Sequence, residues 1–365
     1  MQIGIDSFVE TSLESANGNA AQGAARVRDL LEEIELADQV GLDVFGIGEH
    51  HRQEFIASSP AVILAAAAAR TKRIRLTSAV TVLSSEDPVR VFQQFATLDL
   101  ISQGRAEIIV GRGSFIESYP LFGFDLEDYD SLFAEKLGLL VKLREKTEVH
   151  WKGKHRAPLT GQGVYPRPVQ HPLPIRVGVG GTPQSFARAG ALGLPLAVAI
   201  IGGEPRRFRP LVDLYRESAK NARYVPKKDG PMSSHPPELD VSIHSIGFVA
   251  DTTAQAADDF YPSYAELFSR IGRERGWPPI TRAQFDATRG PTGALLIGDP
   301  ESVAEKIVYE HNVLGGVNRM TMLLNGGMIP HRKAMHAIEL LGTKVAPLVR
   351  NALAPKVEEE LGVRI

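Results

Sequence analysis

The hydrophobic positions along the chain alternate between short apolar runs and longer segments with apolar residues at helical spacing. Residues 2–8 predict a strand, and residues 26–40 predict a helix because their apolar positions recur every three or four residues. Gly41 stands where a glycine often ends a helix, and residues 42–47 predict a second strand. A β-α-β unit of this kind nearly always pairs its strands in parallel, with a right-handed crossover.

The same alternation continues into the C-terminal part of the chain. Further strands are predicted at residues 74–83, 106–110, 175–179, 196–201, 241–249 and 320–324. Further helices are predicted at residues 61–70, 132–143, 211–221, 302–310 and 333–341, and two more begin near Pro88 and at Pro183. Repeated βα units with about eight strands favour an α/β fold of the closed (β/α)8 type, a TIM barrel, over a doubly wound sheet.

The chain of 365 residues is longer than the ~250 residues typical of such a barrel. We therefore predict one TIM-barrel domain over residues 1–365 with insertions in its loops. The candidate insertions are residues 114–130, 151–174, 224–240 and 277–291. Long loops between a strand and the next helix usually wall or cover a functional site.

The composition excludes several kinds of chemistry. With no cysteine, the chain holds no disulfide, no thiolate-bound metal and no thiol nucleophile. Its 41 basic and 43 acidic side chains give a net charge of −2, which argues against nucleic-acid binding. The N-terminus lacks the pattern of a signal peptide, and the longest apolar run, residues 61–69, is far too short to span a membrane. We therefore expect a cytoplasmic protein. We also expect no metal site, because the histidines show no metal-binding spacing.

The segment Gly48-Glu49-His50-His51 follows the second predicted strand. In a barrel the carboxyl ends of the strands form the catalytic face, and histidine can donate or accept a proton near neutrality. His50 is therefore a candidate catalytic residue. The alternatives are a solvated loop, a histidine hydrogen-bonded into a wall, or a metal ligand, although adjacent histidines on extended chain point opposite ways.

A glycine turn at Gly180 and Gly181 leads into a predicted helix. Thr182 suits the N-cap, Pro183 the first helical position, and Ser185 the third, near the free amides of the first turn. This pattern predicts an anion site, most naturally for a phosphate, or else an ordinary capped helix. It is not the dinucleotide-binding motif, because Pro183 stands at the position of the last glycine.

Two weaker candidates come from neighbouring strands. Arg112 lies between Gly111 and Gly113 at the end of a strand, where it could reach a phosphate or form a salt bridge at the rim. The small residues from 77 to 81 could form a flat floor for a planar ring or a narrow layer of the barrel interior.

Several motifs in fixed order carry a resemblance to a known family. The segments are Glu49-His50-His51, Asp87-Pro88-Val89-Arg90, the stretch from Leu98 to Arg105, Val110-Gly111-Arg112-Gly113, Pro172-Leu173-Pro174-Ile175, Gly180-Gly181-Thr182-Pro183 and Gly193-Leu194-Pro195. With them the chain resembles the bacterial luciferase-like flavin monooxygenases, close to the alkanal monooxygenase branch. The resemblance covers residues 1–203 well and the C-terminal third more loosely.

The resemblance implies a TIM barrel that binds reduced FMN and uses molecular oxygen. A peroxyflavin would then insert one oxygen atom into a small organic substrate. A separate flavin reductase would supply the cofactor, and the chain would pair as a homodimer. His50 matches the catalytic histidine of the family, and the Ala79–Val80 bond matches a cis peptide beneath the flavin ring. The positions implied in cofactor binding are Ala79, Val80, Arg112, Gly180, Gly181, Thr182 and Ser185.

Two other functions stay open at this point. A deazaflavin-dependent reductase or dehydrogenase on the same barrel would carry similar phosphate and ring contacts. A flavin-binding protein without turnover would keep the barrel, although the joint presence of the Glu49-His50-His51 motif, Arg112 and Thr182 argues against it. The long segments 224–240 and 277–291 depart from the family pattern, so the substrate class is not predicted.

Overall fold

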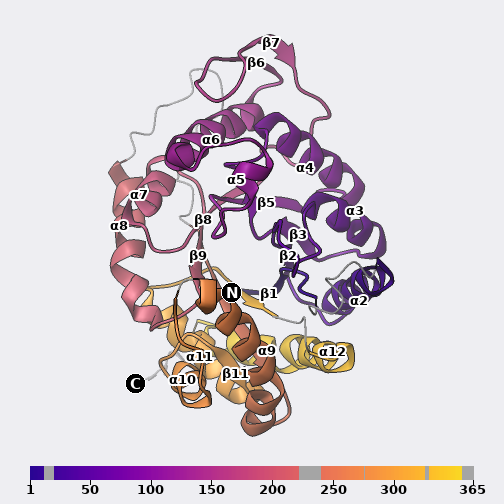
Figure 1. The fold of residues 1–365 in the computed structure, drawn as a ribbon, viewed down its shortest axis with the longest axis vertical. Helices are drawn as coiled ribbons and strands as arrows, with labels where there is room; N and C mark the ends of the chain where they lie inside the picture. The colour runs from indigo at the N-terminus through magenta and orange to yellow at the C-terminus, as the bar shows by residue number, and fades with distance from the viewer. Residues whose placement is uncertain (12–19, 222–239, 275, 325–328, 356–365) are drawn as a thin grey trace, which may run out of the picture.

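Eight parallel strands close into a barrel in the computed structural model. The structure describes residues 1–11, 20–221, 240–274, 276–324 and 329–355. The strands in ring order are β1 (Gln2–Ser7), β2 (Val44–Ile47), β3 (Arg75–Ser78), β5 (Ala106–Gly111), β8 (Ile175–Val179), β9 (Leu196–Ile200), β10 (Val241–Val249) and β12 (Arg319–Leu323). β12 pairs with β1 and so closes the ring. The predicted TIM barrel is confirmed, and Figure 1 shows its helices around the strands.

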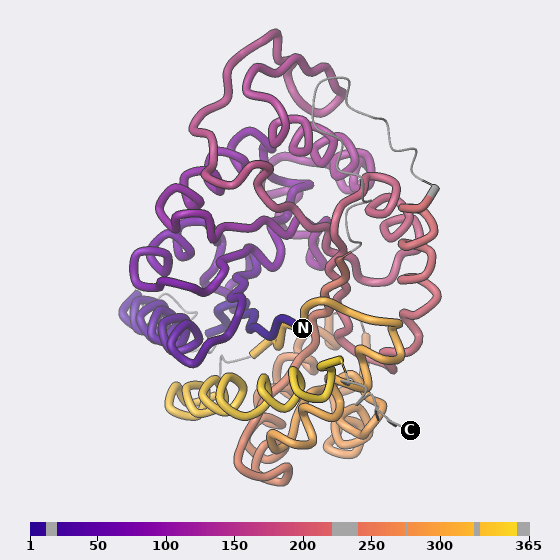
Figure 2. Tube along the Cα trace, turned by 180° about the vertical axis from the view of Figure 1, so that it is seen from behind, coloured from indigo at the N-terminus to yellow at the C-terminus, as the bar shows by residue number. Residues whose placement is uncertain are grey.

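The helices form the outer layer of the barrel. They are α2 (Ala20–Gln39), α3 (Pro60–Arg70), α4 (Pro88–Ser102), α6 (Tyr129–Glu145), α7 (Pro183–Ala191), α8 (Arg209–Asn221), α9 (Thr253–Glu274), α11 (Pro300–Val313), α12 (His331–Leu340) and α13 (Ala346–Ala352). Seen from behind, α12 lies beside α2, so a helix from the C-terminal part of the chain packs against the first helix (Figure 2). None of the helices in the described ranges is long and apolar enough to cross a membrane.

Local signals explain where α4 begins and ends. The Asp87 side chain accepts hydrogen bonds from the backbone N–H groups of Val89 and Arg90, at 2.9 and 3.2 Å, and Pro88 occupies the first turn. The helix stops at Gln103, which adopts a left-handed conformation with φ 55°, and the N–H of Gly104 then bonds to the carbonyl of Asp99. The start of this helix near Pro88 is as predicted.

The structure corrects several predicted elements. The single strand expected at residues 74–83 is split into β3 and β4 (Thr81–Val82), and the cis Ala79–Val80 peptide lies between them. Helix α9 was not predicted, although Phe260, Tyr264 and Phe268 recur at helical spacing, because Pro262 interrupts the pattern. Also unpredicted are the hairpin of β6 (Glu148–Trp151) and β7 (Leu159–Gly163), and β11 (Leu296–Gly298), which pairs with the end of β10.

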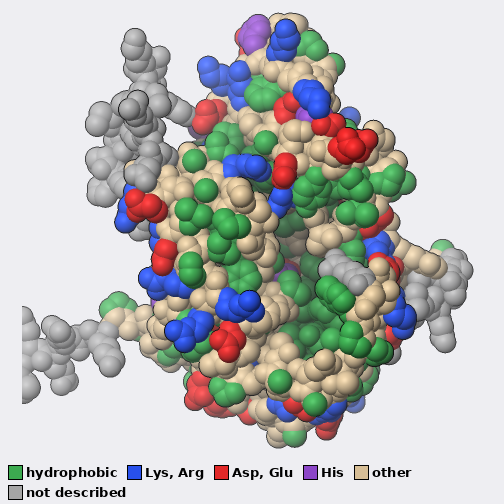
Figure 3. Space-filling view, turned by 60° about the vertical axis from the view of Figure 1, so that its left-hand side comes forward, with side chains coloured by type: hydrophobic (Ala, Val, Ile, Leu, Met, Phe, Trp, Pro, Cys, Tyr) green, Lys and Arg blue, Asp and Glu red, His purple; other side chains and the backbone are tan. Residues whose placement is uncertain are grey.

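The expected insertions carry structure of their own. Residues 114–130 contain α5 (Ser118–Leu121), residues 277–291 contain α10 (Arg282–Thr288), and residues 151–174 include β7, whose hairpin projects away from the barrel in Figure 1. Of residues 224–240, all but Asp240 lie outside the described residues. The face shown in Figure 3 is hollowed between hydrophobic side chains.

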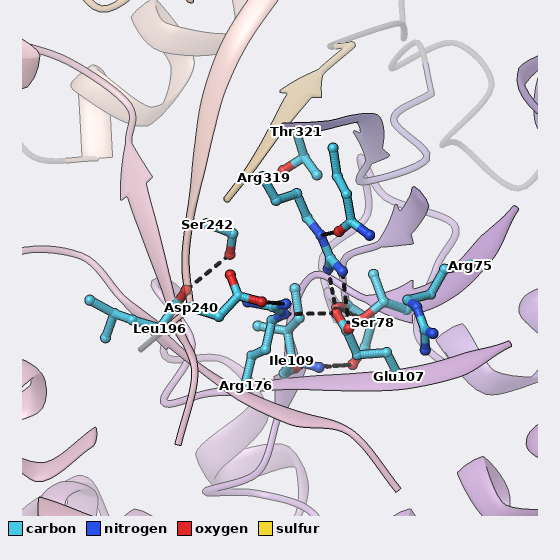
Figure 4. A network of polar contacts seen from close by, with 12 residues as sticks. Arg75, Ser78, Glu107, Ile109, Arg176, Leu196, Asp240, Ser242, Arg319 and Thr321 are labelled. Carbon is cyan, nitrogen blue, oxygen red and sulfur yellow. Dashed lines mark hydrogen bonds and ion pairs between the residues drawn. The ribbon is translucent and has the colours of Figure 1, made fainter. Parts of the chain in front are cut away.

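A charged cluster fills the barrel interior at the amino ends of the strands (Figure 4). The Arg319 guanidinium donates to both oxygens of Glu107, at 2.5 and 3.2 Å, and the Nε of Arg176 lies 3.2 Å from the same carboxylate. Arg176 also pairs with Asp240. Burial alone would raise the pKa of Glu107, but the two arginines outweigh it and lower that pKa to about 2.

Replacing Glu107 by Gln tests this cluster. The variant leaves buried Arg319 without its carboxylate and Arg176 with Asp240 alone, so we expect it to lower the free energy of unfolding by about 3–5 kcal/mol at neutral pH. Because the folded-state pKa lies below the ordinary value of 4.5, the contribution of Glu107 is full above pH 4.5 and is lost as the pH falls towards about 2. Denaturant unfolding at several pH values measures both effects.

The matched control is Glu148→Gln, which changes an exposed carboxylate on β6. It should leave the free energy of unfolding within about 0.5 kcal/mol of the wild type. Equal losses in the two variants would show that the cluster does not stabilise the barrel.

Candidate active site

A cavity of about 750 Å³ opens at the carboxyl ends of the barrel strands. Every barrel strand, or the loop that follows it, contributes to its lining, as does one face of α9. Its volume lies within the range of about 300–1,000 Å³ that small-molecule sites usually have. In TIM barrels this end of the strands carries the active site.

The floor of the cavity contains the cis peptide between Ala79 and Val80, the conformation that the family resemblance implies. Adjacent strands have glycine where they meet it. A Cβ atom at Gly111 or Gly178 would come within 2.7 or 2.8 Å of a Val80 methyl group. A Cβ atom at Gly46 would lie 2.8 Å from that of Ala79. These close approaches require glycine at three strand positions.

Glu49 holds the chain around the cis peptide. Its backbone N–H donates to the carbonyl oxygen of Val80 at 3.1 Å, and its carboxylate accepts from the N–H of Val82 at 2.9 Å. The other carboxylate oxygen lies 2.9 Å from Nε2 of His51. That hydrogen bond raises the pKa of His51. Glu49 and His51 therefore act together as a support for the cavity floor.

His50 lines the cavity inside an aromatic cage. Its ring stacks on Phe55 with centroids 4.4 Å apart, and the edges of Phe8 and Phe115 approach at 4.6 and 5.3 Å. The residue is only 9% exposed. Burial, with smaller contributions from His51 and Arg52, lowers the pKa of His50 to about 3. His50 is therefore a neutral imidazole at physiological pH, and its pKa shifts in the opposite direction to that of His51.

Arg112 and Thr182 meet at the rim of the cavity. One guanidinium nitrogen of Arg112 lies 2.6 Å from Asp130 and the other donates to the Thr182 hydroxyl at 3.2 Å. The guanidinium also lies over the Tyr129 ring. Because Asp130 is exposed, its ion pair with Arg112 is weak and the guanidinium remains free to bind an anion. The salt bridge and the anion-binding interpretation are therefore compatible.

The structure changes the expected roles of the residues around α7. Thr182 occupies the N-cap position, but its hydroxyl accepts from Arg112 and caps no backbone amide. Gly180 lines the cavity, with open space where a Cβ would point. Gly181, which has φ +131°, and the buried Ser185 do not line it. Only part of the predicted phosphate-binding set therefore faces the cavity.

A second polar group on the cavity wall was not predicted. The Asp6 carboxylate accepts hydrogen bonds from Nδ1 of His244, at 2.6 Å, and from the hydroxyl of Thr321. All three residues line the cavity. The available signal was an acidic residue inside the otherwise apolar first strand, but only the tertiary fold brings these three strands together.

The remaining wall is apolar and comes largely from α9. This helix presents Tyr264, Leu267, Phe268 and Ile271 to the cavity, and Trp277 follows it. No group of three or more potential metal ligands is present in the described part of the chain. The site thus combines an arginine at the rim, three histidines in different surroundings and a large apolar wall.

Comparisons with known proteins give the fold and the site a context. A family model described as luciferase-like monooxygenase matches residues 5–316. The chain is 27% identical over 351 residues to 4-hydroxyprotoasukamycin monooxygenase from Streptomyces nodosus subsp. asukaensis, a match that covers 91% of this chain and 89% of that protein.

Two solved structures share the fold at low sequence identity. The oxygenating constituent of 3,6-diketocamphane monooxygenase from Pseudomonas putida, in complex with FMN, has a TM-score of 0.74 at 20% identity and covers 96% of this chain and 98% of its own. The coenzyme F420-dependent tetrahydromethanopterin reductase from Methanopyrus kandleri has a TM-score of 0.69 at 20% identity and covers 95% and 98%.

The aromatic cage predicts an unusual titration of His50. We expect its imidazole to stay neutral from pH 8 down to about pH 4, while His51 titrates above 6.5 because of Glu49. Histidine-selective NMR titration measures both, with a His50→Gln variant to assign the signal. Phe55→Ala opens the cage and should move the His50 pKa upwards. A wild-type His50 that titrates near 6.5 would contradict the proposed burial.

Proposed function

The chain belongs to the luciferase-like monooxygenase family, and on that premise we propose that it uses reduced FMN and molecular oxygen to insert one oxygen atom into a small organic substrate. One observation carries the proposal: Arg112 and Thr182 meet at the start of α7, beside a cavity whose floor is the Ala79–Val80 peptide. We also propose that a separate flavin reductase supplies the cofactor.

The residues at the rim fit the phosphate of FMN. The Arg112 guanidinium presents N–H donors, and the start of α7 adds the partial positive charge of a helix N-terminus. Gly180 leaves room for a ligand to approach the backbone. In this proposal Arg112 and Thr182 bind the phosphate, and the turn through Gly181 and Ser185 supports them from behind the cavity wall.

The floor of the cavity fits a flat ring. Glycines at positions 111 and 178 leave room for the Val80 side chain, and Glu49 holds the chain that follows the Ala79–Val80 bond through its hydrogen bonds to Val80 and Val82. In this proposal the flavin ring rests on Ala79 and Val80. When bound, reduced flavin supplies the electrons that activate oxygen.

His50 has a role that depends on its being neutral. An uncharged imidazole can donate one hydrogen bond and accept another without placing a charge beside the ring. Phe8, Phe55 and Phe115 exclude water around it. We assign His50 to offering a hydrogen bond from the cavity wall, where it would assist the oxygen chemistry that a bound flavin would supply.

A deazaflavin-dependent reductase is the second candidate, because an F420-dependent reductase shares the fold. The two are separated by measuring the affinities for reduced FMN and reduced F420 and then admitting air. Tight binding of F420 with weak binding of FMN would overturn the FMN assignment.

Pairing into a homodimer is a further part of the proposal, supported by the exposed apolar residues Val62, Leu100 and Ile101 on α3 and α4.

The phosphate assignment predicts a difference between two flavins. Arg112→Met removes hydrogen bonds to a charged group, so it should weaken FMN binding by roughly 1.5–3 kcal/mol and leave riboflavin, which lacks the phosphate, unchanged. Titrations followed by flavin fluorescence give both affinities. Arg70→Met, which changes an exposed arginine on α3 far from the cavity lining, is the control. Equal weakening of both flavins by Arg112→Met would refute the assignment.

The role of His50 predicts a change in flavin reoxidation. Wild-type protein should slow the reoxidation of reduced FMN by air relative to free FMN. His50→Ala should keep FMN affinity within about twofold and return reoxidation to the free rate, because one positioned hydrogen bond is lost. Stopped-flow absorbance of the flavin measures the rate. An unchanged rate in the variant would remove His50 from the catalytic residues.

A further inference from the structure

The group formed by Asp6, His244 and Thr321 lies across the barrel from the proposed phosphate site. In the ring order of the strands, β1 is opposite β8 and β12 is opposite β5. Asp6 and Thr321 therefore face the wall that carries Arg112 and Thr182 from the other side of the cavity. A cofactor whose phosphate is held at that rim leaves this wall to a second ligand.

Strand register holds the group in place. Thr321 is the partner of His244 in the pairing of β10 with β12, and Gly46 is the partner of Asp6 in the pairing of β1 with β2. A Cβ atom at Gly46 would collide with Oδ1 of Asp6, so glycine is required there. Asp6 is 1% exposed, and its Oδ1 has no hydrogen-bond partner among the described residues. Glycine at position 46 thus leaves room for the carboxylate, and His244 and Thr321 hold its other oxygen.

The hydrogen bond to Asp6 decides which nitrogen of His244 is available. Nδ1 donates to the carboxylate, so in the neutral ring Nε2 carries the free lone pair. No protein partner for Nε2 is found within the described ranges, and the ring lies in the cavity lining, stacked on Phe8. On the β9 side its register partner is Ala199, which is not ionisable. His244 thus offers one hydrogen-bond acceptor to the cavity, with a carboxylate behind it.

The surroundings define what can reach this acceptor. Phe8, Phe55, Tyr264 and Phe268 line the cavity with the rest of the α9 face. On the side of the cavity formed by these aromatic residues and α9, further polar groups of a ligand would lack partners, at a cost of about 1–3 kcal/mol each. An apolar ring with a single hydroxyl satisfies both the wall and Nε2.

We propose that His244, positioned by Asp6 and Thr321, binds the hydroxyl of an apolar, phenol-like substrate and takes its proton. The O–H bond of the substrate breaks and an N–H bond forms at Nε2, giving a phenolate beside an imidazolium that the Asp6 carboxylate balances. No electron transfer is involved in this step. The proposal rests on the proposed function for the statement that the molecule bound here is the one oxygenated. His50 and His244 then have separate tasks, since the first is enclosed by aromatic rings.

The test uses the full-length protein without cofactor and two probes of the same shape. 4-Nitrophenol carries the hydroxyl, 4-nitrotoluene replaces it by a methyl group, and the absorbance of bound nitrophenol shows whether it is ionised. At a pH below the pKa of the free phenol, wild-type protein should bind it as the phenolate and at least about tenfold more tightly than nitrotoluene.

The variants separate catalysis from packing. His244→Phe and His244→Gln should abolish the phenolate signal and reduce nitrophenol affinity to that of nitrotoluene. Asp6→Asn should abolish the phenolate signal but keep nitrotoluene binding, because an amide at this position no longer balances the imidazolium. A phenolate signal that persists in the His244 variants, or nitrophenol bound only as the neutral phenol by wild-type protein, would overturn the proposal.

FMN affinity is measured on the same samples. Phenolate binding without FMN binding would overturn the proposed function and leave the assignment of His244 intact. FMN binding without phenolate binding would do the reverse.

Discussion

The ion pair between Glu107 and Arg319 is the constraint on which the rest of the barrel depends. Glu107 lies on β5 and Arg319 on β12, which face each other in the ring, so the pair spans the interior. Arg176 and Asp240 extend it to the neighbouring wall. Because Glu107, Arg176 and Arg319 are buried, their charges must remain paired, and the pair between Glu107 and Arg319 holds opposite strands at a fixed separation. The amino end of the barrel is thereby filled, while the carboxyl end stays open as the cavity.

Above this cluster the cavity has walls of different chemistry. Arg112 provides a cationic rim on one side, and Asp6 with His244 provides a polar group on the other. Between them the Ala79–Val80 peptide forms the floor, with glycines in the adjoining strands. This arrangement suits two ligands side by side better than one, because each polar wall has its own charge and its own hydrogen-bonding pattern. The proposal of a cofactor and an apolar substrate follows from that separation.

Much of the fold could be predicted because most of its signals are local. The alternation of strands and helices, the glycine after α2 and the start of α4 depend on residues close together in the chain. Helix α9 was missed because a proline interrupts its pattern, and neighbouring helices and strands stabilise it through packing that the sequence does not display. The division of the third strand into β3 and β4 was missed as well, although the family resemblance implied the cis Ala79–Val80 peptide that lies between them.

For the candidate site too, some features could be predicted from the sequence and others depend on the tertiary structure. The sequence by itself determined which polar residues follow each strand, and so it placed His50, Arg112 and Thr182 at the same end of the barrel. Only the tertiary structure decided that His50 is enclosed by aromatic rings and neutral, while His51 is paired with Glu49. It alone joined Asp6 to His244, two residues far apart in the sequence. The reason is physical: the type of a side chain is local, but its burial, its charge and its partners depend on which strands the closed barrel brings together.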